Sequence, residues 1–270
     1  MKLFILFLLL CVIKPSCSQS LSYPIGSRAI ACGYTGIINR DIWAIYNNPA
    51  GTARLQGIHT GIFCENRFLI PELNRIAIGV FLPLKAGGIY ASVDHMGGPR
   101  YSEMKAGIGY AMPFGEHFSA GIQLNYHMLT IGEGYGNHFS LTFEGGILAR
   151  ISEKLSLGLH IFNPLHMKWI STEEHIPVVF KAGIGYKPEK SIMLLAEINK
   201  SSDKTAIFCA GAEYYFQKKF YIRAGITSGT SRYTFGVGYN IRRIKIDISS
   251  SVHEWLGYSP QLSFTFISGK

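Results

Sequence analysis

Hydrophobic and polar residues alternate between His117 and Ile151. A helix would repeat its apolar positions about every 3.6 residues, whereas successive side chains of a strand point to opposite faces. After a glycine-rich stretch at 132–137, the alternation resumes. This region therefore predicts two strands joined by a turn, each with one apolar and one polar face. The apolar positions of the first strand are Phe118, Ala120, Ile122, Leu124, Tyr126 and Met128.

The same pattern continues over most of the chain. The residues from 56 to 270 provide about 15 residues for each strand with its connection, which fits the roughly 9 to 11 residues of a membrane-spanning strand. We therefore expect an all-β, antiparallel transmembrane barrel of about 14 strands. The predicted strands lie at 57–67, 74–83, 87–95, 101–112, 117–129, 137–151, 154–163, 176–187, 190–199, 204–216, 219–227, 230–241, 244–252 and 258–267.

The predicted connections alternate in length. Those after even-numbered strands are tight, as at 83–85, 152–153 and 188–189, whereas those after odd-numbered strands are mostly longer, up to 164–175. Outer-membrane barrels have short periplasmic turns and longer external loops. An even number of strands then places both ends of the barrel sheet on the periplasmic side.

Composition favours the membrane barrel over a water-soluble sandwich, which would also have one polar and one apolar face. The chain is 47% hydrophobic but only 16% charged, against roughly 25% charged in soluble domains. No segment after the N-terminus approaches the ~20 apolar residues of a membrane helix. We therefore assign the apolar face to lipid and the polar face to the lumen, and expect the outer membrane of a Gram-negative bacterium.

Residues 1–18 have the features of a signal peptide. Lys2 precedes an apolar run at 3–13, and Ser16-Cys17-Ser18 is a small-x-small cleavage site. Its removal takes away Lys2 and Lys14 and lowers the net charge from +9 to +7. We expect the mature chain to be exported and modestly basic.

Residues 19–55 differ from everything after them. They contain many small residues, a short stretch with helical potential at 41–46 and a breaker cluster at 47–51. The predicted strands carry glycines at many inward positions, which indicates that something packs closely against the inner wall or that the barrel bends there. We predict a hatch, or plug, at 19–55 inside a barrel formed by 56–270. Its candidate contacts with the wall or a ligand are Arg28, Trp43 and Tyr46.

Charged residues fall in the middle of strands on the predicted inner face. An unpaired ion in a low-dielectric lumen costs several kcal/mol, so each of these charges must pair or meet water. Two interpretations are open: a selectivity lining or gate, and an ion-pair network that holds the plug in place, which we favour. The residues are Glu144, Lys181, Glu197, Glu213, Arg223 and Arg232.

No motif indicates catalysis. The chain lacks Gly-x-Ser-x-Gly, His-Glu-x-x-His, a phosphate loop and Cys-x-x-Cys. The cysteines after the signal, Cys32, Cys64 and Cys209, have neither a disulfide framework nor a metal-site spacing, so we expect small buried residues, with a single disulfide as the alternative. We predict a protein that is not an enzyme, binds no metal and no cofactor, and has no nucleic-acid partner.

Two motifs near the N-terminus resemble the start of the FadL-type outer-membrane family. They are Gly-x-Arg-Ala at 26–29, followed by Cys32-Gly33, and Asn48-Pro49-Ala50-Gly51. This superfamily includes fatty-acid and hydrocarbon transporters and the PorV-like proteins of the Bacteroidota type IX secretion system. The resemblance covers about 30 residues and implies a fourteen-stranded barrel with an N-terminal hatch, in which Asn48, Pro49 and Ala50 match the family's asparagine-proline-alanine motif. The end of the signal peptide is also similar to Bacteroidota export signals.

The resemblance implies two functions. The prediction is passive transport of a hydrophobic small molecule, in which displacement of the hatch opens a path through a gap in the wall. It implies an apolar pocket beside Trp43 and Tyr46. The alternative is an accessory barrel for protein secretion or envelope assembly, which binds a secretion-system protein. The chain lacks the long external loops with which the transporters capture their ligands, so the sequence does not separate the two. Outer-membrane lipid surrounds the barrel in both.

Overall fold

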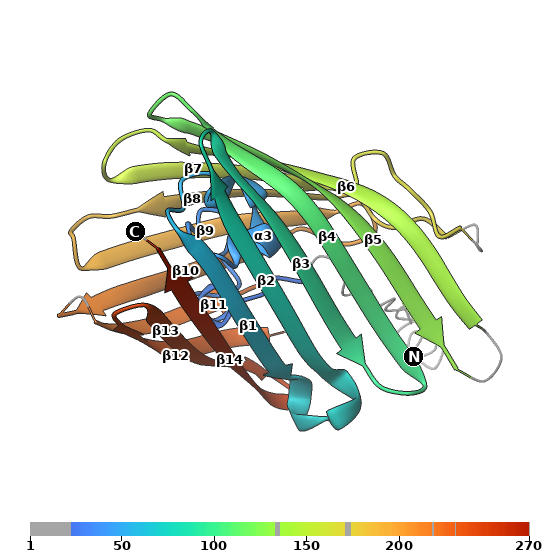
Figure 1. Cartoon of the computed structure of the whole chain (residues 1–270). Helices are drawn as coiled ribbons and strands as arrows, with labels where there is room; N and C mark the ends of the chain where they lie inside the picture. The colour runs from blue at the N-terminus through green and yellow to red at the C-terminus, as the bar shows by residue number, and fades with distance from the viewer. Residues whose placement is uncertain (1–22, 133–135, 171–173, 218, 230, 270) are drawn as a thin grey trace, which may run out of the picture.

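A computed structural model of the chain describes residues 23–132, 136–170, 174–217, 219–229 and 231–269 (Figure 1). Within these ranges, fourteen antiparallel strands form a closed barrel. Each strand pairs with its neighbours in sequence, and β1 closes the ring by pairing with β14. The all-β architecture, the closure and the strand count predicted from the sequence are confirmed. The predicted signal peptide at 1–18 lies outside the described residues.

The strands agree with the predicted ones to within about three residues at each end, because the alternation that forms them is a local property of the sequence. Their bounds are β1 (Ile58–Asn66), β2 (Asn74–Leu84), β3 (Gly87–Gly97), β4 (Tyr101–Phe114), β5 (Phe118–Ile131), β6 (Gly136–Arg150), β7 (Leu155–Phe162), β8 (Val179–Tyr186), β9 (Ile192–Ser201), β10 (Ile207–Phe216), β11 (Phe220–Thr227), β12 (Ser231–Ile241), β13 (Ile244–His253) and β14 (Gly257–Ser268).

The wall is polar inside and apolar outside. On β2, Ile76 and Ile78 are 52% and 47% exposed, whereas Arg75 is 3% exposed. The same alternation holds around the ring, with Ile122 exposed and Gln123 buried on β5. This is the reverse of a soluble protein, in which charged side chains are rarely buried. Among the described residues, no helix is both long and apolar enough to cross a membrane.

The barrel wall is uneven in height. Strands β4, β5 and β6 contain 14, 14 and 15 residues, whereas β7 and β8 contain 8 each. At a rise of about 3.3 Å per residue, the long strands project beyond their neighbours at one end (Figure 1). The projecting end carries the longer connections, including the short 3₁₀ helices η2 (Arg67–Leu69) and η3 (Pro71–Leu73) between β1 and β2.

Strand β8 begins later than the predicted 176–187. The connection before it folds inward, so that Trp169 and Ile176 are buried beside Phe162 and Val179. The side-chain amide of Asn163 holds this arrangement by donating to the carbonyl of Ile176 at 2.7 Å. The apolar residue at 176 therefore packs in a loop instead of extending the strand.

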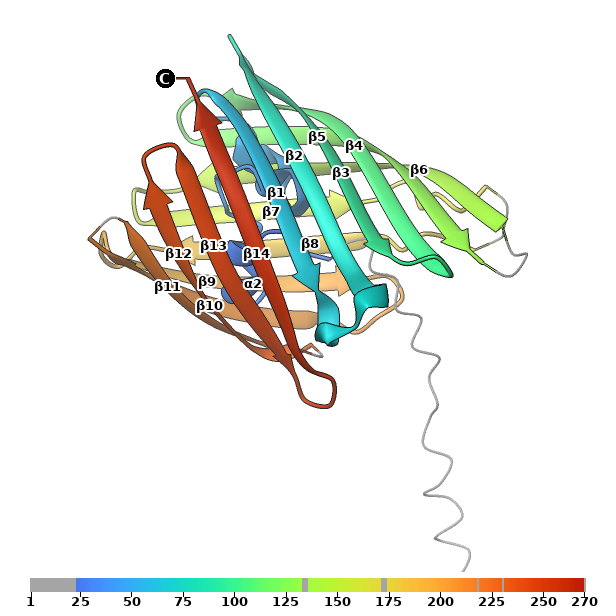
Figure 2. The same cartoon turned by 60° about the horizontal axis from the view of Figure 1, so that its bottom comes forward.

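The chain before β1 forms short helices that lie within the ring of strands in both views (Figures 1 and 2). They are α2 (Ser27–Ala31), α3 (Ala44–Asn47) and the 3₁₀ helix η1 (Pro49–Thr52). Between residues 23 and 53, only Arg40 is exposed. The main apolar core lies between this segment and the inner faces of β1 and β2, where Trp43 and Ile45 cluster with Phe63 and Ala77. We call residues 23–55 the N-terminal segment.

Candidate functional site

Inward glycines allow the N-terminal segment to lie directly on the wall. A Cβ atom added to Gly211 of β10 would lie 2.2 Å from the carbonyl oxygen of Cys32. One added to Gly225 of β11 would lie 2.0 Å from the backbone nitrogen of Gly33. No side chain fits at these distances. Gly33 itself has a φ of +73°, in the left-handed region that glycine tolerates best.

Asn48 connects the N-terminal segment to the wall. Its amide nitrogen donates to the carbonyl of Ile37 within the segment at 2.8 Å and to that of Ile147 on β6 at 3.2 Å. Its amide oxygen accepts the N–H of Ala50 at 3.2 Å and so caps η1. Asn48 thus uses both its donor and its acceptor capacity, and no apolar residue could replace it.

Pro49 and Gly51 each suit their position for a different structural reason. Pro49 occupies the first turn of η1, where its missing N–H removes no helical hydrogen bond. Gly51 lies so close to Asn39 that an added Cβ would be 2.1 Å from the Asn39 carbonyl oxygen. Together with Asn48, these residues form the capped 3₁₀ turn η1 within the predicted breaker cluster at 47–51.

Arg28 of α2 reaches the wall through a carboxylate. Its guanidinium donates to both oxygens of Glu213 on β10, at 3.0 and 2.8 Å, and to Asp41 at 3.2 Å. Glu213 also accepts a hydrogen bond from Arg223, which in turn binds Asp247 at 2.7 Å. Burial alone would lower the pKa of Arg28, but Glu213 raises it well above its ordinary value. Two of the predicted lumen charges therefore belong to one buried chain of ions.

Glu197 on β9 holds a second part of the N-terminal segment. One of its carboxylate oxygens accepts the backbone N–H groups of Gly36 and Ile37, at 2.9 and 3.0 Å. Lys181 on the adjacent β8 is buried, as predicted for an inward residue. Arg232 falls within β12, but its side chain lies outside the described residues.

Glu144 on β6 lies in a network of its own. Its carboxylate accepts hydrogen bonds from Lys105 at 2.9 Å, from Gln123 at 2.8 Å and from Asn125 at 2.9 Å, and its second oxygen lies 2.9 Å from His160. All of these side chains are buried on the inner faces of β4 to β7. The network links four consecutive strands of the wall.

Trp43 and Tyr46 both contact the wall around β1 to β3. The indole of Trp43 lies against Gly61, where an added Cβ would be 2.9 Å from it. The Tyr46 hydroxyl lies 2.7 Å from the carbonyl of Ile78 and 2.8 Å from that of Val93, and its single proton serves one of them at a time. Burial, followed by the charge of Asp94, raises the pKa of Tyr46 well above its usual value, so it stays a donor.

Sequence reasoning missed several buried ions. Arg75 on β2 binds Asp94 on β3 through two hydrogen bonds of 2.6 and 2.5 Å, and Asp247 on β13 binds Arg223. The signal was present, because these residues alternate with outward isoleucines and valines in the same strands. Applied to every predicted strand, the two-residue period would have placed all three inside.

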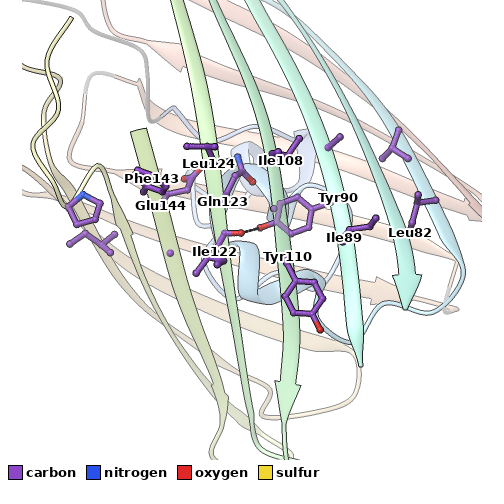
Figure 3. Close-up of a pocket in the computed structure, with 16 residues that line it drawn as sticks. Leu82, Ile89, Tyr90, Ile108, Tyr110, Ile122, Gln123, Leu124, Phe143 and Glu144 are labelled. Carbon is purple, nitrogen blue, oxygen red and sulfur yellow. Dashed lines mark hydrogen bonds between the residues drawn. The ribbon is translucent and has the colours of Figure 1, made fainter. Parts of the chain in front are cut away.

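An apolar groove of about 760 Å³ runs over the outward surface of β2 to β7 (Figure 3). Small residues at two outward positions, Ala91 on β3 and Gly145 on β6, leave the wall hollow between larger neighbours. Trp43 and Tyr46 do not line this groove. Its exposed apolar side chains are Leu82, Ile89, Ile108, Ile122, Leu124, Phe143 and Ile161.

Tyr90 covers the inside of the wall behind the groove. Its ring lies over Gly109, where an added Cβ would be 2.3 Å from the phenolic oxygen, and its hydroxyl donates to the carbonyl of Ile122 at 2.8 Å (Figure 3). The Tyr90 side chain, 4% exposed, and the carbonyl oxygen of Ile122 fill the space that a side chain at Gly109 would take. No local feature of the sequence marks this position, because it depends on which strands become neighbours.

The three cysteines that the structure describes are all free. Cys32 and Cys209 are buried as expected, but Cys64 is exposed, because it falls on the outward face of β1. The expectation of burial was therefore wrong for Cys64. In the described part of the chain, no three histidine, cysteine or acidic side chains gather closely enough to hold a metal ion.

No model of a known protein family matches the chain, and no curated protein matches it either. Solved structures do. The chain is similar to the toluene transporter TbuX of Ralstonia pickettii, with a TM-score of 0.71 and 12% identity over 92% of this chain and 99% of that chain.

Two further structures have the same fold. The toluene transporter TodX of Pseudomonas putida matches with a TM-score of 0.64 and 11% identity, over 92% of this chain and 98% of that chain. A FadL homologue of Pseudomonas aeruginosa matches with a TM-score of 0.61 and 11% identity, over 90% and 98%. The structural neighbours are thus FadL-type barrels, and at these identities the likeness is one of fold.

Proposed function

We propose that this chain is an outer-membrane barrel for the passive passage of a hydrophobic small molecule, in a Gram-negative bacterium. The apolar outer surface, the polar interior and the fold that it shares with toluene transporters support this function. Closure of the barrel pairs each strand with a neighbour on both sides and leaves no open sheet edge, as hydrocarbon requires. No catalytic group takes part, so the ligand leaves chemically unchanged.

The groove over β2 to β7 carries the proposal. Hydrophobic ligands bind in concave, mostly apolar sites of about 300 to 1,000 Å³, and the groove has about 760 Å³. It lies on the surface that would face lipid, where a hydrophobic molecule accumulates. A monoaromatic hydrocarbon such as toluene, the ligand class of two structural neighbours, is of suitable size and polarity.

The N-terminal segment is the proposed hatch, and it contacts the same part of the wall. Tyr46 donates to the carbonyl of Ile78 or to that of Val93, and Asn48 donates to that of Ile147. These carbonyls belong to β2, β3 and β6, which also form the groove. Displacement of the segment would release the wall at the groove, and the ligand would then pass beside Tyr90 into the lumen.

Larger side chains in the groove test this function. Ala91→Phe and Gly145→Phe would fill the two hollow positions with rings that a ligand must pass, and should lower the uptake of toluene into proteoliposomes about tenfold or more. An added Cβ at Gly145 meets nothing closer than 3.6 Å, so the fold tolerates it. Ala224→Phe on the outward face of β11, opposite the groove in the strand order, is the matched control.

Toluene uptake that stays the same in all three variants would exclude the groove as the path of the ligand.

Among the predicted lumen charges, we propose that Glu197 and Glu213 hold the hatch in place, since both bind the N-terminal segment directly. The alternative of a secretion or assembly partner remains a prediction. Isolation of the native chain together with a translocon, followed by loss of secretion on its deletion, would favour that alternative.

A further inference from the structure

Basic side chains gather at the end of the barrel where the tight turns lie. Among the described residues, the turns after the even-numbered strands and their immediate flanks contain eight bases and three acids. All of the bases are exposed except Arg150, which is half-buried. The bases are Lys85, Arg150, Lys154, Lys187, Lys190, Lys219, Arg242 and Arg243, and the acids are Glu116, Glu153 and Glu189.

The turn between β4 and β5 has no lysine or arginine of its own, but the N-terminal segment supplies one. Arg54 donates to the carbonyls of Gly115 and Phe118 in that turn, at 2.6 and 3.2 Å. Each of the six tight turns therefore carries at least one cation. Desolvation, followed by the charges of Arg150 and Arg54, lowers the pKa of Arg40, which lies near both of these cations.

The opposite end of the barrel has no such excess. Its described connections, together with Lys200 near the end of β9, contain five bases and four acids of similar exposure, so the charges nearly cancel. The bases there are Arg67, Arg100, Lys168, Lys200 and Lys204, and the acids are Glu72, Glu174, Asp203 and Glu254. The net charge of the chain is thus polarised along the barrel axis.

Large apolar side chains flank the basic turns on the outer surface. Tyr186 precedes Lys187, and Phe216 and Phe220 lie on either side of Lys219. These three aromatic side chains are 44 to 50% exposed. Aromatic residues mark the boundary between hydrocarbon and headgroups in membrane proteins. The cations next to them are therefore at the depth of lipid headgroups.

We propose that these cations bind anionic phospholipid headgroups of the leaflet at the turn end. We call them the basic rim: the eight turn bases together with Arg54. The rim surrounds the barrel beside apolar strand ends, which suits a ring of lipids better than one acidic protein on a single patch. Short turns place this end in the periplasm. The inference rests on the proposed membrane location and is independent of transport.

Lipid selectivity tests the rim. The full chain is reconstituted in phosphatidylcholine bilayers with trace spin-labelled phosphatidylglycerol or phosphatidylcholine, and the immobilised fraction of each gives a relative association constant. A cation near an anionic headgroup favours it by about fivefold, so we expect phosphatidylglycerol to be preferred by about that factor. High salt should reduce the preference, because the rim is exposed to water.

Two triple variants, each of which removes three positive charges, show which end of the barrel causes the preference for phosphatidylglycerol. Lys154→Gln, Lys190→Gln and Arg243→Gln together remove three rim charges, and the preference should fall toward one. Arg100→Gln, Lys200→Gln and Lys204→Gln remove three charges at the opposite end and should leave it unchanged. Toluene uptake in the rim variant reports transport separately.

Three results would overturn the proposal: no preference in the natural chain, an equal loss in both triple variants, and a preference abolished by equimolar soluble glycerol phosphate. The last would mean that the rim recognises free phosphate instead of a lipid. Capture of an acidic protein that depends on the rim, without any lipid preference, would also count against it.

Discussion

At the scale of single residues, buried ions connect the N-terminal segment to the wall. Glu213 binds Arg28 on one side and Arg223 on the other, and Arg223 continues to Asp247. The side chain of Glu213 is fully buried. Removing one member of such a chain leaves its buried partners charged and with less counter-charge, which costs more than the intact pair contributes.

Glu213→Gln is therefore expected to destabilise the folded barrel by about 3 to 5 kcal/mol, because two guanidiniums lose their shared counter-charge. The urea concentration at which the folded band disappears from a cold SDS gel measures this. Glu189→Gln in an exposed turn is the control and should change stability by less than about 0.5 kcal/mol. Equal midpoints for the two variants would contradict the ionic account.

The sequence predicted that Glu213 and Arg223 face inward, but it did not predict which residues they bind. Alternation alone placed Glu213 and Arg223 inside, since it needs only a few neighbouring residues. The bond between Arg28 and Glu213 spans 185 residues, and it depends on how the segment is positioned in the finished barrel. No pattern near Arg28 contains that information.

At the scale of elements, the N-terminal segment and the glycines of the wall fit each other. The strand bounds could be predicted closely, because each strand follows from its own alternation. Helix α2 could not, since its five residues are too few for a helical period and its buried face depends on the wall. The late start of β8 was also missed, because Ile176 packs against Trp169 in the preceding loop.

Gly225→Ala tests whether that fit holds the segment in place. The new methyl group would overlap the backbone of Gly33, so the segment must move, and single-channel conductance in planar bilayers should rise from near zero to open events. Gly145→Ala on the outward face is the control, with nothing within 3.6 Å of its Cβ. A closed Gly225→Ala barrel with normal stability would show that the segment does not close the lumen.

At the scale of the whole molecule, the barrel is inverted with respect to a soluble protein. Charged residues such as Arg75 and Asp94 are buried, and large apolar residues cover the outside. Composition and alternation were enough to predict this inversion. The groove was not predictable, because its hollow positions, Ala91 and Gly145, lie on different strands and become a cavity only when six strands assemble.

The most direct test is the accessibility of nitroxide labels on the reconstituted barrel. Single cysteines replace Ile122 and Ile248, which are 67% and 53% exposed on opposite walls, and Trp255, which is 84% exposed in a connection. The natural cysteines are first changed to alanine. We expect labels at 122 and 248 to collide with oxygen dissolved in the bilayer, and the label at 255 with a water-soluble nickel complex. Nickel access at 122 and 248 would contradict the account.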